Sequence, residues 1–108
     1  MEGKFPGAEN VEELWSMCQN AKIGTSKITP NPSENPNARN KDWVGVEPVL
    51  NGIDQFDAEF FGISPREANW MSPEQRLLLE VAWHTFERAG LKPSEIEDLV
   101  GVFVGGGP

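Results

Sequence analysis

The sequence holds few residues of the kinds that catalytic and metal sites usually need. Its 108 residues include one cysteine, Cys18, and one histidine, His84. A single cysteine excludes an internal disulfide and a metal site built from several cysteines. No apolar run approaches the roughly 18 residues of a membrane helix, and no signal-peptide pattern opens the chain. We therefore expect a cytoplasmic protein that binds no membrane and carries no metal or other cofactor.

Basic residues are scarce relative to acidic ones. The chain has 9 Lys and Arg residues against 17 Asp and Glu residues, which gives a net charge of -8. Such a surface repels phosphate backbones, so nucleic acids are not expected as partners. A chain of 108 residues is one domain at most, and 11 glycines and 9 prolines are many for a tightly packed one.

The first ordered segment is predicted as a helix that begins after Asn10. Four residues fall at the i, i+3, i+4 and i+7 positions of one helix face: Val11, Leu14, Trp15 and Cys18. Asn10 can cap this helix, and the Glu13 carboxylate can reach back toward the cap. We expect Cys18 to be a small buried apolar side chain, because no cation near it in sequence would activate its thiol.

The next segment, residues 24–42, is predicted as a mobile loop. Its only apolar residues are Ile28 and Ala38, so it cannot bury enough surface to offset the entropy of ordering it. Residues 43–50 alternate weakly between apolar and polar, and Pro48 restricts them to a short or edge strand.

Two serines, each followed by proline, predict two helix starts, at Ser64 and Ser72. The second starts a long helix, residues 73–89, which Gly90 ends in the left-handed conformation. The apolar arc of this helix is wide, so we expect the helix to be buried on more than one side.

Residues 100–104 form an unbroken apolar run that is typical of a core strand in a covered parallel sheet. The backbone N–H and C=O groups of such a strand need partners on both edges, and the chain offers no convincing parallel neighbour. The simplest interpretation is an α/β fold of which this sequence is one part, with mostly helices and loops around one core strand.

No residue is assigned to catalysis, to cofactor binding or to a metal. His84 lies between Glu80 and Arg88 at helical spacing, which favours a surface or interface ion pair. Ser64 lacks the second glycine of a nucleophile elbow and fits a helix cap better. The glycines at 105–107 are an incomplete phosphate loop and fit a tight turn. An acyl-carrier protein is set aside, because the chain has no Asp-Ser-Leu tripeptide.

One long motif is recognisable. Residues 60–83 read FFGISPREANWMSPEQRLLLEVAW, which closely resembles the N-terminal part of β-ketoacyl synthase domains, particularly those of modular polyketide synthases. Four further segments also resemble the family: KFPGA at 4–8, EELW at 12–15, IDQFD at 53–57 and GVFVG at 101–105. The resemblance therefore covers nearly the whole chain, residues 1–108.

The resemblance implies a thiolase-like fold, with layered α/β/α/β/α sheets, and a homodimer of synthase subunits. In the family, a cysteine takes an acyl chain from a phosphopantetheinylated acyl-carrier protein. Two histidines then assist decarboxylation of an extender on a second carrier, and the resulting carbanion attacks the acyl-cysteine. That cysteine has a Thr-Ala-Cys-Ser context, which Cys18 does not match. His84 matches neither histidine, so we expect this chain alone to be inactive.

Three departures from the family pattern stand out. Ser72 takes the place of the usual Asp, which also caps helices, and Lys4 takes the place of an Arg. The loop at 24–42 is short and lacks the usual aromatic and basic residues. Met1 aligns inside the end of the family's first strand, so we expect a fragment that lacks that strand.

The sequence thus indicates a partial domain of a polyketide-type synthase. Three charged residues within its apolar motif are predicted to form buried or half-buried structural ion pairs: Arg66, Glu67 and Arg76. The alternative is a non-catalytic interaction module or regulatory remnant, whose apolar helix face would bind an intact synthase subunit. A fatty-acid-type synthase is a weaker third interpretation, which the motif at 61–67 argues against.

Overall fold

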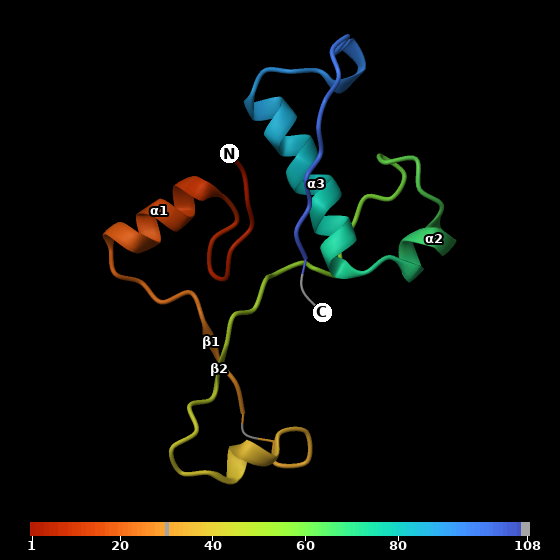
Figure 1. Ribbon diagram of the computed structural model, residues 1–108. Helices are drawn as coiled ribbons and strands as arrows, with labels where there is room; N and C mark the ends of the chain where they lie inside the picture. The colour runs from red at the N-terminus through yellow and green to blue at the C-terminus, as the bar shows by residue number, and fades with distance from the viewer. Residues whose placement is uncertain (30, 107–108) are drawn as a thin grey trace.

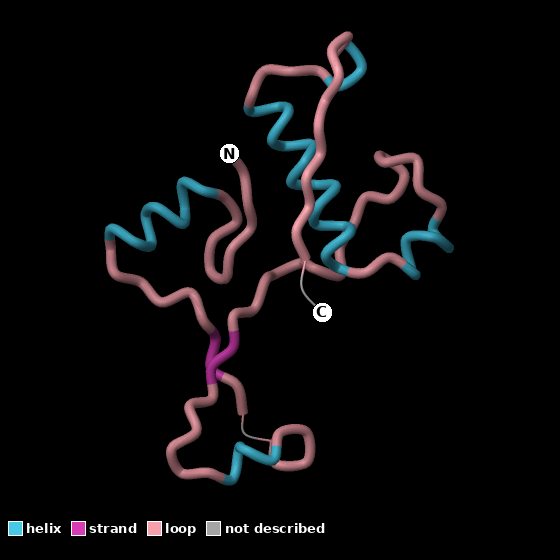
Figure 2. The backbone as a smooth tube through the Cα atoms, in the orientation of Figure 1, coloured by secondary structure: helices cyan, strands magenta, loops and turns pink. Residues whose placement is uncertain are grey.

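The computed structural model describes residues 1–29 and 31–106, in which short elements are joined by long loops (Figures 1 and 2). In chain order the elements are α1 (Val11–Gln19), β1 (Ser26–Lys27), the 3-10 turn η1 (Pro36–Arg39), β2 (Val46–Glu47), α2 (Pro65–Trp70), α3 (Pro73–Arg88) and the 3-10 turn η2 (Pro93–Glu95). With one two-stranded sheet in the described residues, the helices are not arranged around a common sheet in this chain.

The predicted helix after Asn10 is confirmed as α1. The Asn10 side chain accepts a hydrogen bond from the Glu13 N–H at 2.8 Å. The Glu13 carboxylate reaches back to the N–H of Glu9, at 2.9 Å. The first bond satisfies a backbone donor that the first turn of the helix leaves free, and the second ties the residue before the cap to the helix.

The two predicted helix starts are also confirmed. Ser64 accepts a hydrogen bond from the Glu67 N–H at 3.2 Å and caps α2. Ser72 and Gln75 form a reciprocal capping box at the start of α3, with bonds of 3.4 and 3.1 Å. At the other end, Gly90 has φ of +69° and ends α3, as the sequence predicts.

β1, η1 and β2 lie on an arm that extends away from the helices (Figure 2). Its strands pair antiparallel, Ser26 with Glu47 and Lys27 with Val46. The short strand predicted within 43–50 is therefore confirmed as β2. The loop predicted at 24–42 contains β1 and η1, and its residue Pro30 lies outside the described residues.

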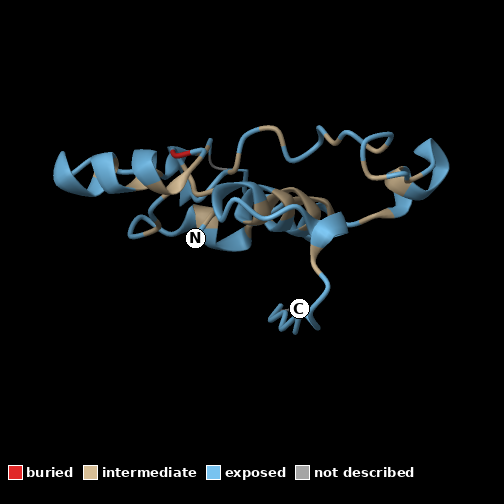
Figure 3. Cartoon of the chain, turned by 90° about the horizontal axis from the view of Figure 1, so that it is seen from above, coloured by how far each residue is buried: buried red, intermediate tan, exposed pale blue. Residues whose placement is uncertain are grey.

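A tight turn at Pro6 and Gly7 shapes the N-terminal segment. Phe5 and Ala8 exchange backbone hydrogen bonds of 2.8 and 3.0 Å across it, and Gly7 has φ of +79°, where glycine is favoured. Ala8 is 2% exposed and is the only buried residue in the described part of the chain. Figure 3 shows this single buried position against an otherwise exposed or half-exposed surface.

The chain is much more open than a compact domain of its length. Its radius of gyration is 17.9 Å, against about 13 Å expected for a compact chain of this size. Its accessible surface is 9014 Å², against about 6,000 Å² for a folded protein of this mass. The described residues therefore enclose almost no core of their own.

Two expectations about the core are wrong for this chain. Helix α3 spans Pro73–Arg88 but has no buried residue, although we expect burial on more than one side. No strand forms at residues 100–104, where Phe103 is 98% exposed. A strand exists only when its N–H and C=O groups are paired, and no other described segment pairs with these residues.

Cys18 is exposed on α1, which corrects the prediction that it is buried. The half-buried residues of α1 are Val11, Leu14 and Met17, a stripe with spacing i, i+3 and i+6. Met17 lies against Gly7 and Gly24. This stripe faces the N-terminal turn, so Cys18 falls on the adjacent side of the helix, which the described chain leaves uncovered.

The ion pairs predicted for Arg66, Glu67 and Arg76 do not form among the described residues. Arg66 is exposed, and the Glu67 carboxylate instead accepts a hydrogen bond from the Ser64 hydroxyl at 3.3 Å. Arg76 is half-buried and donates to the Ala68 carbonyl at 2.8 Å. The Nε atom of Arg76 is buried and has no hydrogen-bond partner among the described residues.

Candidate functional site

The residues with catalytic potential lie on the surface and take local partners. The His84 Nδ1 atom is 3.1 Å from a carboxylate oxygen of Glu87, and both side chains are more than half exposed. His84 therefore has a surface partner, but the expected partners are wrong: Glu80 pairs with Lys4, and Arg88 pairs with Glu2 and Glu12. No hydrogen bond joins His84 to Cys18 in the described part of the chain.

The two other motifs considered for catalysis or binding, Ser64 and the glycines at 105–107, show no catalytic or phosphate-binding arrangement in the described residues. Ser64 is a helix cap. Gly105 and Gly106 are exposed, with no neighbouring atom within 4 Å of a Cβ built on either, and Gly107 lies outside the described residues. The Ser64 hydroxyl lies beside the Glu67 carboxylate, but both groups belong to the cap of α2.

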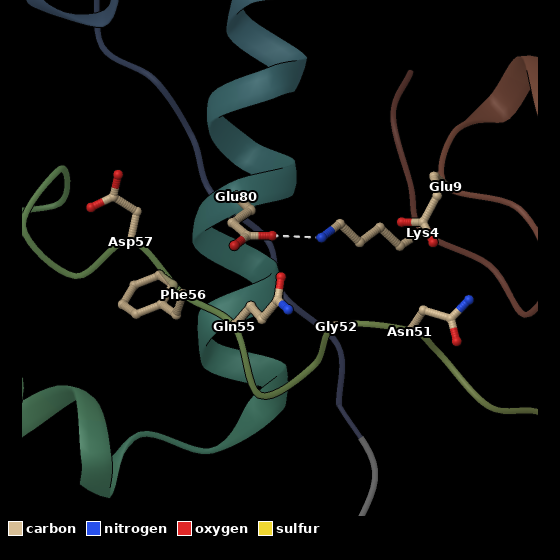
Figure 4. Close-up of a pocket in the computed structure, with 8 residues that line it drawn as sticks. All are labelled: Lys4, Glu9, Asn51, Gly52, Gln55, Phe56, Asp57 and Glu80. Atoms are coloured by element: carbon tan, nitrogen blue, oxygen red, sulfur yellow. Dashed lines mark hydrogen bonds and ion pairs between the residues drawn. The ribbon is translucent and has the colours of Figure 1, made fainter.

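A polar cavity, which we call the polar hollow, lies between the N-terminal segment and α3 (Figure 4). Its volume is about 430 Å³. Its lining comes from three parts of the chain: Lys4, Glu9, Asn51, Gly52, Gln55, Phe56, Asp57 and Glu80. Lys4 spans it to reach Glu80, with 2.7 Å between the ammonium nitrogen and a carboxylate oxygen.

The side chains of the polar hollow form ion pairs and hydrogen bonds. Lys4 and Glu80 are 25% and 21% exposed and neutralise one another. No group of three or more ligating side chains suited to a metal occurs in the part of the chain that the structure describes. The hollow therefore has the chemistry of a structural contact between two segments.

Arg88, at the end of α3, joins three parts of the molecule. Its two terminal nitrogens are 2.6 and 2.8 Å from the two carboxylate oxygens of Glu12 on α1. Its Nε atom is 2.8 Å from a carboxylate oxygen of Glu2. Hydrogen bonding to Arg88 is the largest of the effects that lower the pKa of Glu12 from 4.5 to about 2. The same bond raises the pKa of Arg88 above its usual range.

An aromatic cluster fixes the motif at 60–68 against α3. Phe60 meets Trp83 edge to face, with ring centroids 4.8 Å apart. Phe61 meets Phe60 in the same manner at 5.0 Å and stacks on Phe56 at 5.3 Å. Such contacts add about 0.5–1.5 kcal/mol each beyond the burial of apolar surface, so the motif that carries the resemblance acts as a packing element.

An apolar groove of about 420 Å³ runs along α3 and beside the C-terminal segment. Its apolar lining consists of Leu50, Leu77, Leu78, Val81 and Val104. Leu78 and Val104 are 44% and 62% exposed. The wide apolar arc of α3 is thus present but left largely open by this chain.

Sequence reasoning missed the ion pairs that link the N-terminal segment to α3. The partners Lys4 and Glu80 are 76 positions apart, as are Glu12 and Arg88. Helical periodicity indicates neighbours three or four positions apart, so it could not have revealed these pairs. One sign of the pair between Lys4 and Glu80 was present in the sequence: position 4 keeps a positive charge, because Lys4 stands where the family resemblance has Arg.

The comparisons with known proteins give one consistent result. The family model described as "Beta-ketoacyl synthase, N-terminal domain" matches residues 1–108. The chain is 65% identical to Polyketide synthase GfsA from Streptomyces halstedii, over 97% of this chain and 2% of that protein. It is 44% identical to Polyketide synthase PksM from Bacillus subtilis, over 97% of this chain and 3% of that protein.

A solved structure agrees with these relatives. The ketosynthase from module 6 of the bacillaene synthase from Bacillus subtilis is 34% identical, with a TM-score of 0.67. The match covers 82% of this chain and 16% of that one. The predicted relationship to ketosynthases and their thiolase-like fold is therefore confirmed.

No helix in the described residues has the length and apolar character needed to cross a membrane. The chain spans a small share of the relatives it matches, 2–3% of two polyketide synthases and 16% of a ketosynthase. Within that share, the family match extends from residue 1 to residue 108. This chain belongs to the β-ketoacyl synthase N-terminal domain family and corresponds to the N-terminal part of polyketide synthase ketosynthases.

Proposed function

We propose that this chain forms the N-terminal part of a ketosynthase domain that joins acyl thioesters by decarboxylative condensation. The 65% identity to Polyketide synthase GfsA across 97% of the chain carries this proposal. The open apolar groove along α3 supports it, because a helix with a wide apolar arc needs covering by further structure.

The chemistry would be supplied by parts of the ketosynthase domain other than residues 1–108. In such an enzyme a cysteine thiolate attacks the acyl thioester and releases the carrier thiol. Loss of carbon dioxide from a malonyl-type extender gives a carbanion, which forms the new carbon–carbon bond as the cysteine thiolate leaves. Cys18 is exposed on α1 and has no histidine bonded to it among the described residues. This supports the proposal that the chain alone is inactive and serves as framework.

The proposed partners follow from the same assignment. They are a phosphopantetheinylated acyl-carrier protein and a second synthase subunit, in the cytoplasm.

A chimera tests the proposal. Residues 1–108 replace the matching segment of the ketosynthase domain of Polyketide synthase GfsA, and condensation is measured with acyl- and malonyl-carrier substrates. We expect activity within about tenfold of the parent domain, which corresponds to a change of roughly 1.4 kcal/mol in the activation barrier. The matched control carries the segment of Polyketide synthase PksM, which is 44% identical to this chain. A folded but inactive chimera beside an active control would contradict the proposal.

The second candidate is a non-catalytic module that binds an intact synthase subunit through the apolar groove. The exposure of Leu78 and Val104 favours it. The adjoining coding sequence separates the two candidates: a reading frame that continues into a Thr-Ala-Cys-Ser segment supports the ketosynthase, and its absence supports the module.

A further inference from the structure

We propose that five charged residues form an ion-pair clamp that sets the direction and register in which the N-terminal segment docks on α3. The ion-pair clamp consists of Glu2, Lys4, Glu12, Glu80 and Arg88. It unites the N-terminal segment and α1 with α3, although the partners lie more than 70 positions apart in the chain.

The order of the charges specifies one docking direction. Along the N-terminal segment the order is negative at Glu2 and positive at Lys4, and along α3 it is negative at Glu80 and positive at Arg88. The structure pairs Glu2 with Arg88 and Lys4 with Glu80, so the two segments run antiparallel. The reverse direction would bring Glu2 toward Glu80 and Lys4 toward Arg88, like charge against like.

The spacing of the partners fits this arrangement. Glu80 and Arg88 are about 12 Å apart along the helix axis, at 1.5 Å per residue. Glu2 and Lys4 are about 7 Å apart in an extended chain. The long side chains of Lys4 and Arg88 cover the difference, and Figure 4 shows Lys4 stretched across the polar hollow toward Glu80.

Arg88 is the member that lysine cannot replace. Its guanidinium binds both carboxylate oxygens of Glu12 and, through Nε, one oxygen of Glu2. A lysine ammonium keeps the charge but lacks the planar fork that makes two parallel bonds. The clamp thus depends on geometry as well as on charge.

Charge contributes to this docking beside limited apolar burial. In the described residues only Ala8 is fully buried, while Phe5 and Pro6 of the N-terminal segment are half-buried. The exposed pairs of the clamp are screened by salt, because the Debye length falls from about 10 Å at 0.1 M to about 3 Å at 1 M. The docked segment is therefore a salt-sensitive element of the fold.

The single cysteine allows a direct test in the full chain. A nitroxide attached to Cys18, which is exposed on α1, broadens the NMR signals of α3 amides near Arg88 while α1 is docked. We expect Lys4→Glu and Glu80→Lys to abolish this broadening, and the double variant Lys4→Glu/Glu80→Lys to restore it. Arg88→Lys should lose it in part, and about 1 M salt should weaken it in the wild type.

Lys92→Glu is the matched control. It makes the same charge change as Lys4→Glu, but the partner of Lys92 is the local residue Glu95. Broadening should persist in this variant. Broadening that survives both single clamp variants overturns the proposal, and so does a double variant that fails to restore it. Where a single variant loses its helical circular dichroism, the double variant decides. Recovery of the helical signal and of the broadening supports the proposal, and failure to recover them overturns it.

Discussion

At the scale of single residues, the N-terminal turn depends on the absence of a side chain at Gly24. A Cβ atom built there would collide with the Pro6 carbonyl and approach the Met17 methyl group at 2.8 Å. A backbone carbonyl cannot move aside as the end of a flexible side chain can. Gly24 is thus the point at which α1 and the Pro6–Gly7 turn close on one another.

Gly24→Ala should separate the turn from α1. We expect a loss of about 1–3 kcal/mol, as for other overpacked positions, measured as a lower urea midpoint for α1 helicity. Gly105→Ala is the control, because a Cβ there meets open space, and it should change the midpoint little. Equal midpoints for the two variants would refute the close contact.

The carboxyl group of Glu12 reports on its bond to Arg88. Its pKa is about 2 in the folded chain, below the ordinary value of 4.5. Because the folded pKa is the lower one, the bond stabilises the fold above about pH 4.5, and this contribution is lost as the pH falls toward 2. An NMR titration of Glu12 should show the low pKa in the wild type and a value near 4.5 in Arg88→Met. A wild-type titration near 4.5 would mean that the bond to Arg88 is absent in solution.

At the scale of elements, helix boundaries were the most predictable part of the fold. The caps at Asn10, Ser64 and Ser72 involve partners three positions away, so their signal is contained in a few adjacent residues. The predicted end at Gly90 depends on the same kind of local information. The ion pairs of α3 with the N-terminal segment left no local sign and were not predictable.

Ser72 offers a test of capping at α3. Ser72→Ala should destabilise the helix by about 1 kcal/mol, seen as reduced protection of its first-turn amides from hydrogen exchange. Ser72→Asp, which restores the usual residue of the family resemblance, should keep the protection. Ser94→Ala is the control, since the turn η2 has no side-chain cap. Loss of protection in Ser72→Asp would argue against the capping role.

The strand expected at residues 100–104 shows the limit of local patterns. The apolar run is real, but Val102 and Phe103 are 79% and 98% exposed. Apolar composition indicates what a segment prefers to bury, whereas a strand also needs a paired neighbour. Residues 100–104 lie within the family match, which accounts for their apolar pattern. No described segment pairs with them, so the pattern is present without a strand.

At the scale of the whole molecule, the chain is a set of capped helices with little core. Its surface of 9014 Å² and radius of gyration of 17.9 Å describe a part of a domain that has apolar faces left open. The aromatic cluster and the ion-pair clamp give it internal order, and the groove along α3 remains uncovered.

The isolated chain should consequently be marginally stable and prone to associate. Exposed apolar faces of this kind drive self-association, so its sedimentation should depend on concentration and its thermal melt should be broad. Within the chimera, the same residues should join one sharp transition. A sharp, cooperative melt of a dilute monomer would show that the chain has a sufficient core of its own.

The central claim is that this chain supplies framework to a ketosynthase and not its nucleophile. Peptide mapping by mass spectrometry, after the chimera is incubated with an acyl-carrier substrate, tests it most directly. The acyl group should be found on the cysteine of the Thr-Ala-Cys-Ser segment, and Cys18→Ala should load to the same extent. An acyl thioester on Cys18, lost in Cys18→Ala, would contradict the account.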